Sequence, residues 1–273
     1  MSGVLYIVTT PIGNLGDFSP RGQQTLSSVD LIVAEDTRHS RNLLNYFGID
    51  KPLFSLHEHN EVNRIDSLIQ RLLQGDSVAQ ISDAGTPLIN DPGYLLARRA
   101  REEGIEITAI PGPSAPVVAL SLSGLPVNRF SFEGFIPSRA VAREQFLQQL
   151  AAETRTLIFF ESPRRVVESL QAMRSCFGPE RRVSVARELT KIHESVHTAP
   201  LCELIEWMES DSNNRRGEFV LVVEGAQEED KDDSEAYRIV EIIARELAPR
   251  KAAAVAAEIT GVRKNKLYRS LVE

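Results

Sequence analysis

The sequence predicts an α/β fold with two α/β domains, followed by a small helical domain. Short apolar runs rich in β-branched residues alternate with amphipathic helical segments through most of the chain. An acidic run then precedes a segment with helical periodicity, and a length of 273 residues suits more than one hydrophobic core. The predicted divisions are 1–124 and 125–225 for the α/β domains, 226–233 for an acidic linker and 234–273 for the helical domain.

The first domain is predicted to hold buried parallel strands joined by helices. Its apolar, β-branched runs are Val4–Thr10, Leu31–Glu35, Ser77–Ser82 and Ile105–Ile110. A first helix begins at Pro20 with Ser19 as its N-cap. Three more helices each end before a glycine, and they are Thr37–Phe47, Val62–Gln74 and Tyr94–Glu103. This repeated βα pattern favours an open, mostly parallel sheet.

The second domain is predicted to contain a mixed sheet. Its expected strands are Phe130–Ile136, Thr156–Phe160, Arg182–Glu188, Ile192–Thr198 and Glu218–Glu224. Its expected helices are Arg139–Ala152, Pro163–Phe177 and Leu201–Glu209.

The last segment has the outline of a helix-turn-helix. An amphipathic helix over Ser234–Leu247 is followed by helices over Pro249–Glu258 and Arg263–Val272, which a Thr-Gly-Val turn separates. Eight basic residues against five acidic ones give this segment a net charge of +3, whereas the rest of the chain carries −10. The segment is either a small helical cap on the body or a unit that docks nucleic acid.

Several classes of protein are excluded. No run approaches the eighteen apolar residues of a membrane span, and the N-terminus lacks the basic region and cleavage site of a signal peptide. Cys176 and Cys202 have neither disulfide-framework nor metal-site spacing. We therefore expect a cytoplasmic protein.

Three polar loops rich in glycine and proline follow strands of the first domain. They are Thr9–Asp17, Ser82–Gly93 and Pro111–Ala115. The carboxyl ends of parallel strands share one edge of a sheet, and open α/β sheets bind ligands there. The loops contain neither GxGxxG nor a P-loop lysine, so ordinary dinucleotide and P-loop sites are excluded. Tight connection geometry is the alternative, and it explains single glycines or prolines better than three such loops.

The order of these loops is similar to that of tetrapyrrole methylases (class III S-adenosylmethionine-dependent methyltransferases) and diphthine synthase. Five motifs resemble more narrowly the RsmI family of 16S ribosomal RNA ribose methyltransferases. They are Thr-Pro-Ile-Gly-Asn-Leu-Gly-Asp (10–17), Ala-Glu-Asp-Thr-Arg (34–38), Asp-Ala-Gly-Thr-Pro (83–87), Phe-Phe-Glu-Ser-Pro-Arg-Arg (159–165) and Ala-Arg-Glu-Leu-Thr-Lys-x-His-Glu (186–194). The resemblance spans residues 4–225 and fits the helical tail.

The resemblance implies that S-adenosylmethionine binds, folded, in a cleft between the two α/β domains. The implied cofactor contacts are Pro11, Asp83, Thr86, Ser114, Ala115, Phe160, Glu161, Ala186 and Glu218. Glu161 departs from the methionine usual in tetrapyrrole methylases. A carboxylate there is suited to accept from a ligand hydroxyl or amine, which suggests a different use of the cleft. No metal is required, because a sulfonium donor brings its own leaving group.

The resemblance also implies methyl transfer to the ribose 2′-hydroxyl of a cytidine, expected at cytidine 1402 in the decoding region of 16S ribosomal RNA. Such a weak acid reacts faster with a general base or a cation beside it. The leading candidates are Asp36, Arg38, Glu188 and His193, and the others are His57, Glu58, His59 and Lys191. Asp36 and Arg38 have an alternative role as an ion pair with each other. His57 and His59 would share one face of a strand, but two ligands are weak evidence for a metal.

Basic side chains are the expected contacts to RNA phosphate. The candidates are Arg164, Arg165, Arg263, Lys264, Lys266 and Arg269, with Arg139 and Arg143 in addition, although solvated helix faces produce the same pattern. The expected partners are 16S ribosomal RNA in the 30S subunit and a second copy of the chain, with no DNA or membrane. Two other functions stay open: a tetrapyrrole methyltransferase, which uses the same loops, and a non-catalytic RNA-binding assembly factor.

Overall fold

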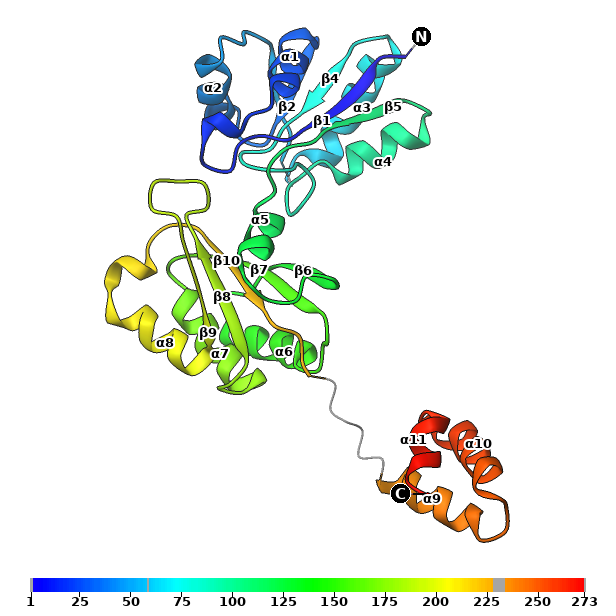
Figure 1. Cartoon of the computed structure of the whole chain (residues 1–273). Coiled ribbons are helices and arrows are strands. Elements are labelled where there is room, and N and C mark those ends of the chain that lie inside the picture. The colour runs from blue at the N-terminus through cyan, green and yellow to red at the C-terminus, as the bar shows by residue number, and fades with distance from the viewer. Residues whose placement is uncertain (1, 58, 228–233, 273) are drawn as a thin grey trace. The chain divides into compact units, whose positions relative to one another are not determined.

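The computed structural model describes residues 2–57, 59–227 and 234–272, and it divides into two compact units, Met1–Gly225 and Ala226–Glu273 (Figure 1). The first unit contains two five-stranded sheets, and the second contains helices. Most of the predicted acidic linker, residues 228–233, lies outside the described residues. No helix in the described ranges has both the length and the apolar content needed to cross a membrane.

The first sheet is entirely parallel, as predicted. Its strands are β1 (Val4–Val8), β2 (Leu31–Ala34), β3 (Leu53–Ser55), β4 (Val78–Gln80) and β5 (Glu106–Ile110). Their order is β3-β2-β4-β1-β5, so β1 lies between β4 and β5. The sequence did not predict β3, because this edge strand is only three residues long and half-buried. The loops after β1, β4 and β5 leave one edge of the sheet side by side.

Helices cover both faces of the first sheet (Figure 1). Leu68 of α3 (Glu61–Leu73) and Leu96 of α4 (Tyr94–Glu102) pack with Leu5 of β1 on one face. Leu26 of α1 (Pro20–Ser28) and Leu44 of α2 (Thr37–Tyr46) pack on the other face. A short 3-10 helix, η1 (Leu15–Asp17), follows the loop after β1. Burial on both faces explains why these strands read as apolar runs rather than as alternating patterns.

The second sheet is mixed, as predicted. Its strands are β6 (Phe130–Phe135), β7 (Thr156–Glu161), β8 (Arg182–Arg187), β9 (Ser195–Pro200) and β10 (Phe219–Val223), in the order β6-β7-β10-β8-β9. Only β6 and β7 are parallel neighbours, and the other pairs are antiparallel. β9 begins at Ser195 rather than at the predicted Ile192, because Ile192 lies in the preceding turn with 97% of its surface exposed.

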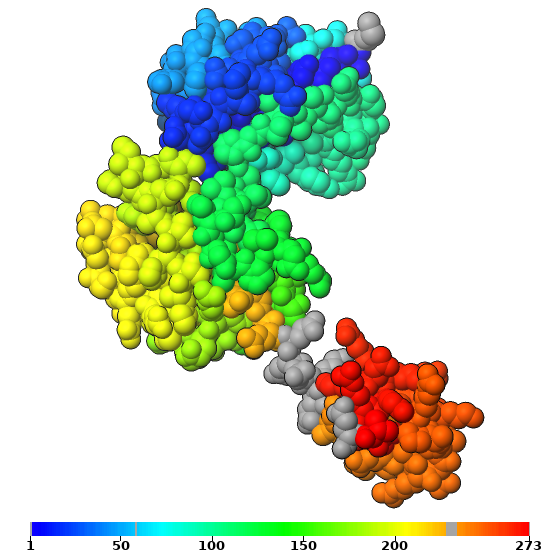
Figure 2. Space-filling view, in the orientation of Figure 1, coloured from blue at the N-terminus to red at the C-terminus, as the bar shows by residue number. Residues whose placement is uncertain are grey.

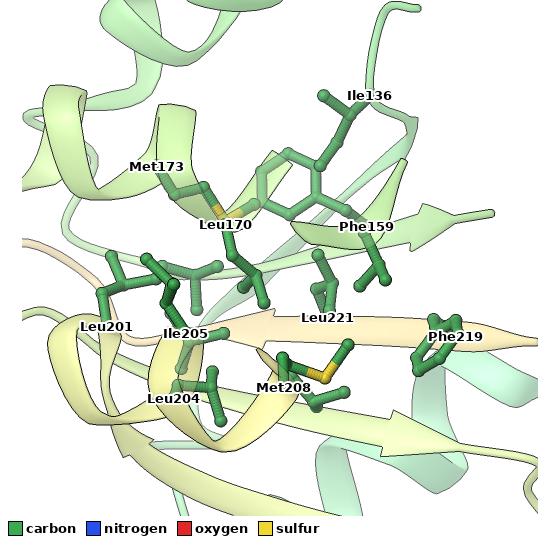
Figure 3. Close-up of a cluster of buried hydrophobic side chains, with 14 of the residues drawn as sticks. Ile136, Phe159, Leu170, Met173, Leu201, Leu204, Ile205, Met208, Phe219 and Leu221 are labelled. Atoms are coloured by element: carbon green, nitrogen blue, oxygen red, sulfur yellow. The ribbon is translucent and has the colours of Figure 1, made fainter. Parts of the chain in front are cut away.

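Three helices bury one face of the second sheet. They are α6 (Ala140–Leu150), α7 (Val166–Phe177) and α8 (Leu201–Ser210), and a 3-10 helix, η2 (Ser212–Arg215), follows α8. Figure 3 shows Leu170 and Met173 from α7 and Met208 from α8 gathered over Phe159 and Leu221 of the strands. Burying side chains of this size contributes about 1.5–3 kcal/mol each, so this cluster is a main source of stability.

The opposite face of the second sheet is covered by α5 (Ala115–Leu122). Its Ala119 and Leu120 pack with Ile158 of β7 and Val220 of β10. The sequence did not predict this helix, because its apolar residues show no one-sided pattern and it starts within the Pro-Gly-Pro-Ser loop. α5 therefore links the loop after β5 directly to the second sheet.

The second unit confirms the predicted helical domain. It consists of α9 (Ser234–Ala244), α10 (Pro249–Thr260) and α11 (Lys264–Arg269). Val240 and Leu267 pack against the alanine face of α10. Gly261 ends α10 at φ 72°, a left-handed conformation that favours glycine. The last helix ends at Arg269, three residues before the predicted end.

Candidate functional site

Backbone hydrogen bonds join the loops after β1 and β4. Thr10 and Gly85 form an isolated antiparallel bridge, with N···O distances of 2.9 and 3.1 Å. The Thr10 hydroxyl also donates to the Ser82 carbonyl at 3.1 Å, and Thr86 donates to the carbonyl of Pro113 at 3.5 Å. The third loop is thus attached as well, and the three loops form one continuous surface.

A cavity of about 390 Å³ opens on these loops and is closed on its other side by the ends of β7 and β10 and by the turn after β8. Figure 2 shows the surface of the first unit hollowed between the parts that hold its two sheets. Seven of the predicted cofactor contacts line the cavity, and they are Asp83, Thr86, Ser114, Ala115, Phe160, Glu161 and Glu218.

Two predicted cofactor contacts do not line the cavity. Pro11 is buried beneath it, and its neighbour Ile12 reaches the wall instead. Ala186 is fully buried in β8, and its partner Val220 on β10 lines the cavity. In these two segments it is therefore a neighbouring or paired residue, rather than the predicted one, that lines the cavity.

The loop after β4 holds two non-glycine residues in the left-handed region. Leu88 has φ 74° and Asn90 has φ 65°. Such conformations persist only where the surrounding structure imposes them, and they concentrate at functional sites. Here the end of the loop is fastened by Gln80, whose side-chain amide donates to the Pro92 carbonyl at 2.8 Å.

A buried carboxylate from a neighbouring helix fixes the same loop. Glu61 of α3 accepts from the backbone N–H groups of Gly93 and Leu95, each at 3.1 Å. These groups begin α4, so the carboxylate satisfies donors that the helix itself leaves unpaired. Gln80 and Glu61 thus hold the end of the loop that leads into α4, next to its cavity-lining residue Asp91.

Asp91 lies on this loop and lines the cavity, and the sequence reasoning missed it. Burial raises the pKa of its carboxyl to about 6, the nearby charge of Asp83 also raises it, and a hydrogen bond from Ser82 acts in the opposite direction. The sequence signal was the Asn-Asp-Pro-Gly end of a loop already singled out. Nothing in that string separates Asp91 from the exposed aspartates of other loops.

Glu161 is engaged by the protein itself. One carboxylate oxygen accepts from the Ser162 backbone N–H at 2.6 Å and pairs with Arg165 at 2.8 Å. The other accepts from the Ser169 hydroxyl, and the side chain is fully buried. These bonds fix the Glu161 carboxylate at the β7–α7 turn, and its expected role of accepting from a ligand hydroxyl or amine stays a prediction.

Lys191 joins two acidic residues at the edge of the cavity. Its ammonium group lies 2.9 Å from Glu188 and 3.0 Å from Glu218. Burial alone raises the pKa of Glu188, but the Glu218 N–H and Lys191 outweigh it and lower that pKa. Likewise, burial lowers the pKa of Lys191, but its bonds to both carboxylates raise it overall. This turn thus stabilises charged side chains.

Asp36 and Arg38 pair with each other. Asp36 caps α2, accepting from the backbone N–H of Arg38 at 2.8 Å, and its carboxylate lies 3.3 Å from the guanidinium. The backbone hydrogen bond lowers the pKa of Asp36, which makes it a weaker base. Neither residue lines the cavity. The Asp36 N–H instead donates to Asp83 at 3.3 Å and so orients a cavity carboxylate.

The predicted histidines lie away from the cavity. His193 is exposed in the turn before β9. His57 and His59 follow β3 rather than lying on a strand, so the prediction of a shared strand face is wrong, and Glu58 lies outside the described residues. Within the described part of the chain, no group of three metal-binding side chains is found.

The predicted RNA-binding arginines of the first unit differ in exposure and in the bonds that they form within the protein. Arg165 is held by Glu161, by the Ser162 hydroxyl at 3.0 Å and by the Ile136 carbonyl at 3.2 Å, so it is not available for phosphate. Arg143 is buried and bonds Glu168 at 3.2 Å. The exposed candidates of the whole chain are Arg139, Arg164, Arg263, Lys264, Lys266 and Arg269.

Comparison with known proteins identifies the family. The model for Tetrapyrrole (Corrin/Porphyrin) Methylases matches residues 4–205, and that for the RsmI C-terminal HTH domain matches residues 230–273. The chain is 51% identical to "Ribosomal RNA small subunit methyltransferase I" of Escherichia coli O157:H7, over 99% of this chain and 95% of the relative. It is also 51% identical to the protein of that name from Pseudomonas aeruginosa, over 100% and 98%.

Solved structures share the fold at low sequence identity. A crystal structure of diphthine synthase covers 82% of this chain and 90% of its own with a TM-score of 0.61 at 16% identity. The methyltransferase CobJ covers 82% and 95% with a TM-score of 0.60 at 19% identity. The predicted fold class and family resemblance are both confirmed. The chain belongs to the tetrapyrrole methylase family and, within it, to the ribosomal RNA small subunit methyltransferase I proteins.

Proposed function

We propose that this methyltransferase transfers a methyl group from S-adenosylmethionine to the ribose 2′-hydroxyl of a cytidine in 16S ribosomal RNA, at cytidine 1402 of the decoding region. The observation that supports it is a cavity on the carboxyl edge of a parallel sheet, in a chain related along its full length to ribosomal RNA small subunit methyltransferase I proteins. The cavity volume of about 390 Å³ lies in the usual range for cofactor sites.

The residues of the cavity fit the proposed cofactor. Ser114 is the N-cap of α5, yet its hydroxyl makes no capping bond, so the hydroxyl and the helix N-terminus are suited to a carboxylate. Asp83 is suited to accept from an amino or ribose hydroxyl group, and the half-buried ring of Phe160 offers an apolar face to adenine. S-adenosylmethionine supplies an activated methyl group with its own leaving group. The protein's part is to align the acceptor oxygen and exclude water.

The second unit is proposed to dock the RNA. Arg263 is the N-cap residue of α11, and Lys264 and Arg269 are exposed along that helix. Phosphate contacts of this kind make the affinity fall steeply as salt rises. We also propose that the cytoplasmic 30S particle is the substrate and that two copies of the chain act together, since a two-fold dimer presents two basic units to one RNA.

The test is methylation of 30S particles purified from cells that lack this protein, with a radiolabelled methyl donor and digestion of the RNA to nucleosides. We expect label in 2′-O-methylcytidine. Donor binding without label in RNA would overturn the proposal and favour a small-molecule acceptor. Absence of donor binding in calorimetry would favour a non-catalytic assembly factor.

The docking role is tested in the full chain. Replacing Arg263, Lys264 and Arg269 together by alanine is expected to raise the KM for 30S particles and to flatten its salt dependence, with kcat little changed. The matched control replaces three arginines of α4, namely Arg98, Arg99 and Arg101. An equal rise in KM from both variants would contradict a specific role for α11.

A further inference from the structure

Four carboxylates line the cavity, and two of them are paired with cations. Glu161 is bonded to Arg165 and fully buried, and Glu218 is bonded to Lys191. The other two, Asp83 and Asp91, come from the loop after β4. Asp83 accepts the backbone N–H of Asp36, so the neighbouring strand end already holds it.

Like Asp83, Asp91 forms no ion pair in the described part of the chain, and its pKa is clearly raised, through burial and the nearby charge of Asp83. Its loop is built to hold it there, because Asn90, the residue before it, is left-handed at φ 65°. The residue after it, Pro92, is fastened by the Gln80 amide, and Glu61 binds the N–H groups that follow. A strained residue directly before a cavity-lining carboxylate, with the backbone directly after it held by two side chains, indicates a chemical role for that carboxylate.

We propose that Asp91 is the general base of the methyl transfer, an inference that rests on the proposed function. One carboxylate oxygen accepts the proton of the ribose 2′-hydroxyl while that oxygen forms a bond to the methyl carbon. The bond between this carbon and the sulfonium sulfur breaks, and its electron pair stays on sulfur, which becomes a neutral thioether. Asp91 then releases the proton to solvent, so the enzyme returns to its starting state.

The charges around Asp91 suit a proton acceptor near neutral pH. Its own loop contributes Asp83, and the carboxylate of Glu61, from α3, binds the backbone at the start of α4. The remaining charged groups of the cavity are the Glu161–Arg165 and Glu218–Lys191 pairs, in which each carboxylate has its own cation. Burial and Asp83 together raise the pKa of Asp91 to about 6, where a carboxylate is a stronger base but still ionised at pH 7.

The other acidic candidates are weaker bases. Asp36 and Glu188 both have a lowered pKa, the first from the Arg38 N–H and the second, against the effect of burial, from the Glu218 N–H and Lys191. Neither of them lines the cavity. Asp91 lines the cavity and has a raised pKa, so it is a better candidate for the base than Asp36 or Glu188.

The test compares wild type, Asp91→Asn and Asp91→Glu, with Asp66→Asn on the exposed face of α3 as a matched control. Wild-type kcat/KM for the donor is expected to rise with pH through a limb centred near 6. Asp91→Asn is expected to lose this limb and about 10²- to 10⁴-fold in kcat, with donor affinity in calorimetry within a few-fold of wild type. Asp91→Glu is expected to keep part of the rate.

Three results would overturn the assignment. They are a wild-type profile without the limb, an Asp91→Asn enzyme that keeps the rate and the limb, or loss of donor affinity that accounts for the whole defect. The last outcome would make Asp91 a binding residue. Failure of the proposed function looks different, because wild type itself would then leave no 2′-O-methylcytidine.

Discussion

The loop after β4 and the turn between β8 and β9 share a strained backbone, but the pKa of a carboxylate is raised in the first and lowered in the second. Each has two non-glycine residues in the left-handed region, Leu88 and Asn90 in the first, Glu188 and Thr190 in the second. Asp91 is half-buried and lies near a second carboxylate of its own loop, whereas Glu188 is bonded to a lysine of its own turn and to a backbone N–H directly before β10. The strained backbone thus restricts the position of each carboxylate, and the neighbouring groups set whether its pKa is raised or lowered.

The largest expected effect comes from breaking the geometry of the first loop. In Gly93→Ala the new methyl group would lie 1.5 Å from the Gln80 amide, at φ +112°. We expect a loss of about 3 kcal/mol of unfolding free energy and most of the activity, measured by denaturant melts and methylation assays.

The matched control is Gly48→Ala. It is also left-handed, at φ +66°, but it has nothing within 4 Å of the new methyl group. It should cost about 1 kcal/mol with activity retained. Equal losses in both variants would show that conformation alone, rather than the fastening of the loop, sets the cost.

The second effect concerns the lysine that distinguishes the two regions. Lys191→Met removes the cation from Glu188 and Glu218 and is expected to cost about 1 kcal/mol at pH 7. A lowered pKa for Glu188 means stability that is present above the unfolded pKa and lost as pH falls through the folded one. The variant should therefore differ from wild type at pH 7 and converge with it in acid. A loss independent of pH would show that Lys191 acts by packing.

The smallest expected effect is on the stability of Asp91→Asn. Because the pKa of Asp91 is raised in the folded state to about 6, the folded state binds more protons, and stability falls as pH rises from the ordinary aspartate pKa of 3.8 to about 6. A neutral asparagine avoids this loss, so the variant should melt at a higher temperature than wild type at pH 7.5 and at the same temperature near pH 3.5. A lower melting temperature at pH 7.5 would contradict the assigned environment.

The sequence predicted the segments of the site better than the roles within them. The loops after β1, β4 and β5 could be predicted because a run of apolar residues followed by glycine and proline is visible within a short stretch of sequence. Asp83 and Asp91 lie in one such loop, but their surroundings include strands far along the chain, so burial could not be read from the loop itself. Glu161 had a readable partner in Arg165, four residues later. The motif alone suggested a ligand contact because it says nothing of that bond.

The bridge between Thr10 and Gly85 consists of backbone groups, which every residue except proline possesses. The bridge consequently survives many substitutions at Thr10, whereas Gly85, at φ +82°, has a left-handed backbone that favours glycine. A framework of this kind allows the side chains that line the cavity to change while the backbone bridge between the two loops is kept. The solved structures with TM-scores of 0.60 and 0.61 at 19% and 16% identity show that the fold itself is compatible with very different sequences.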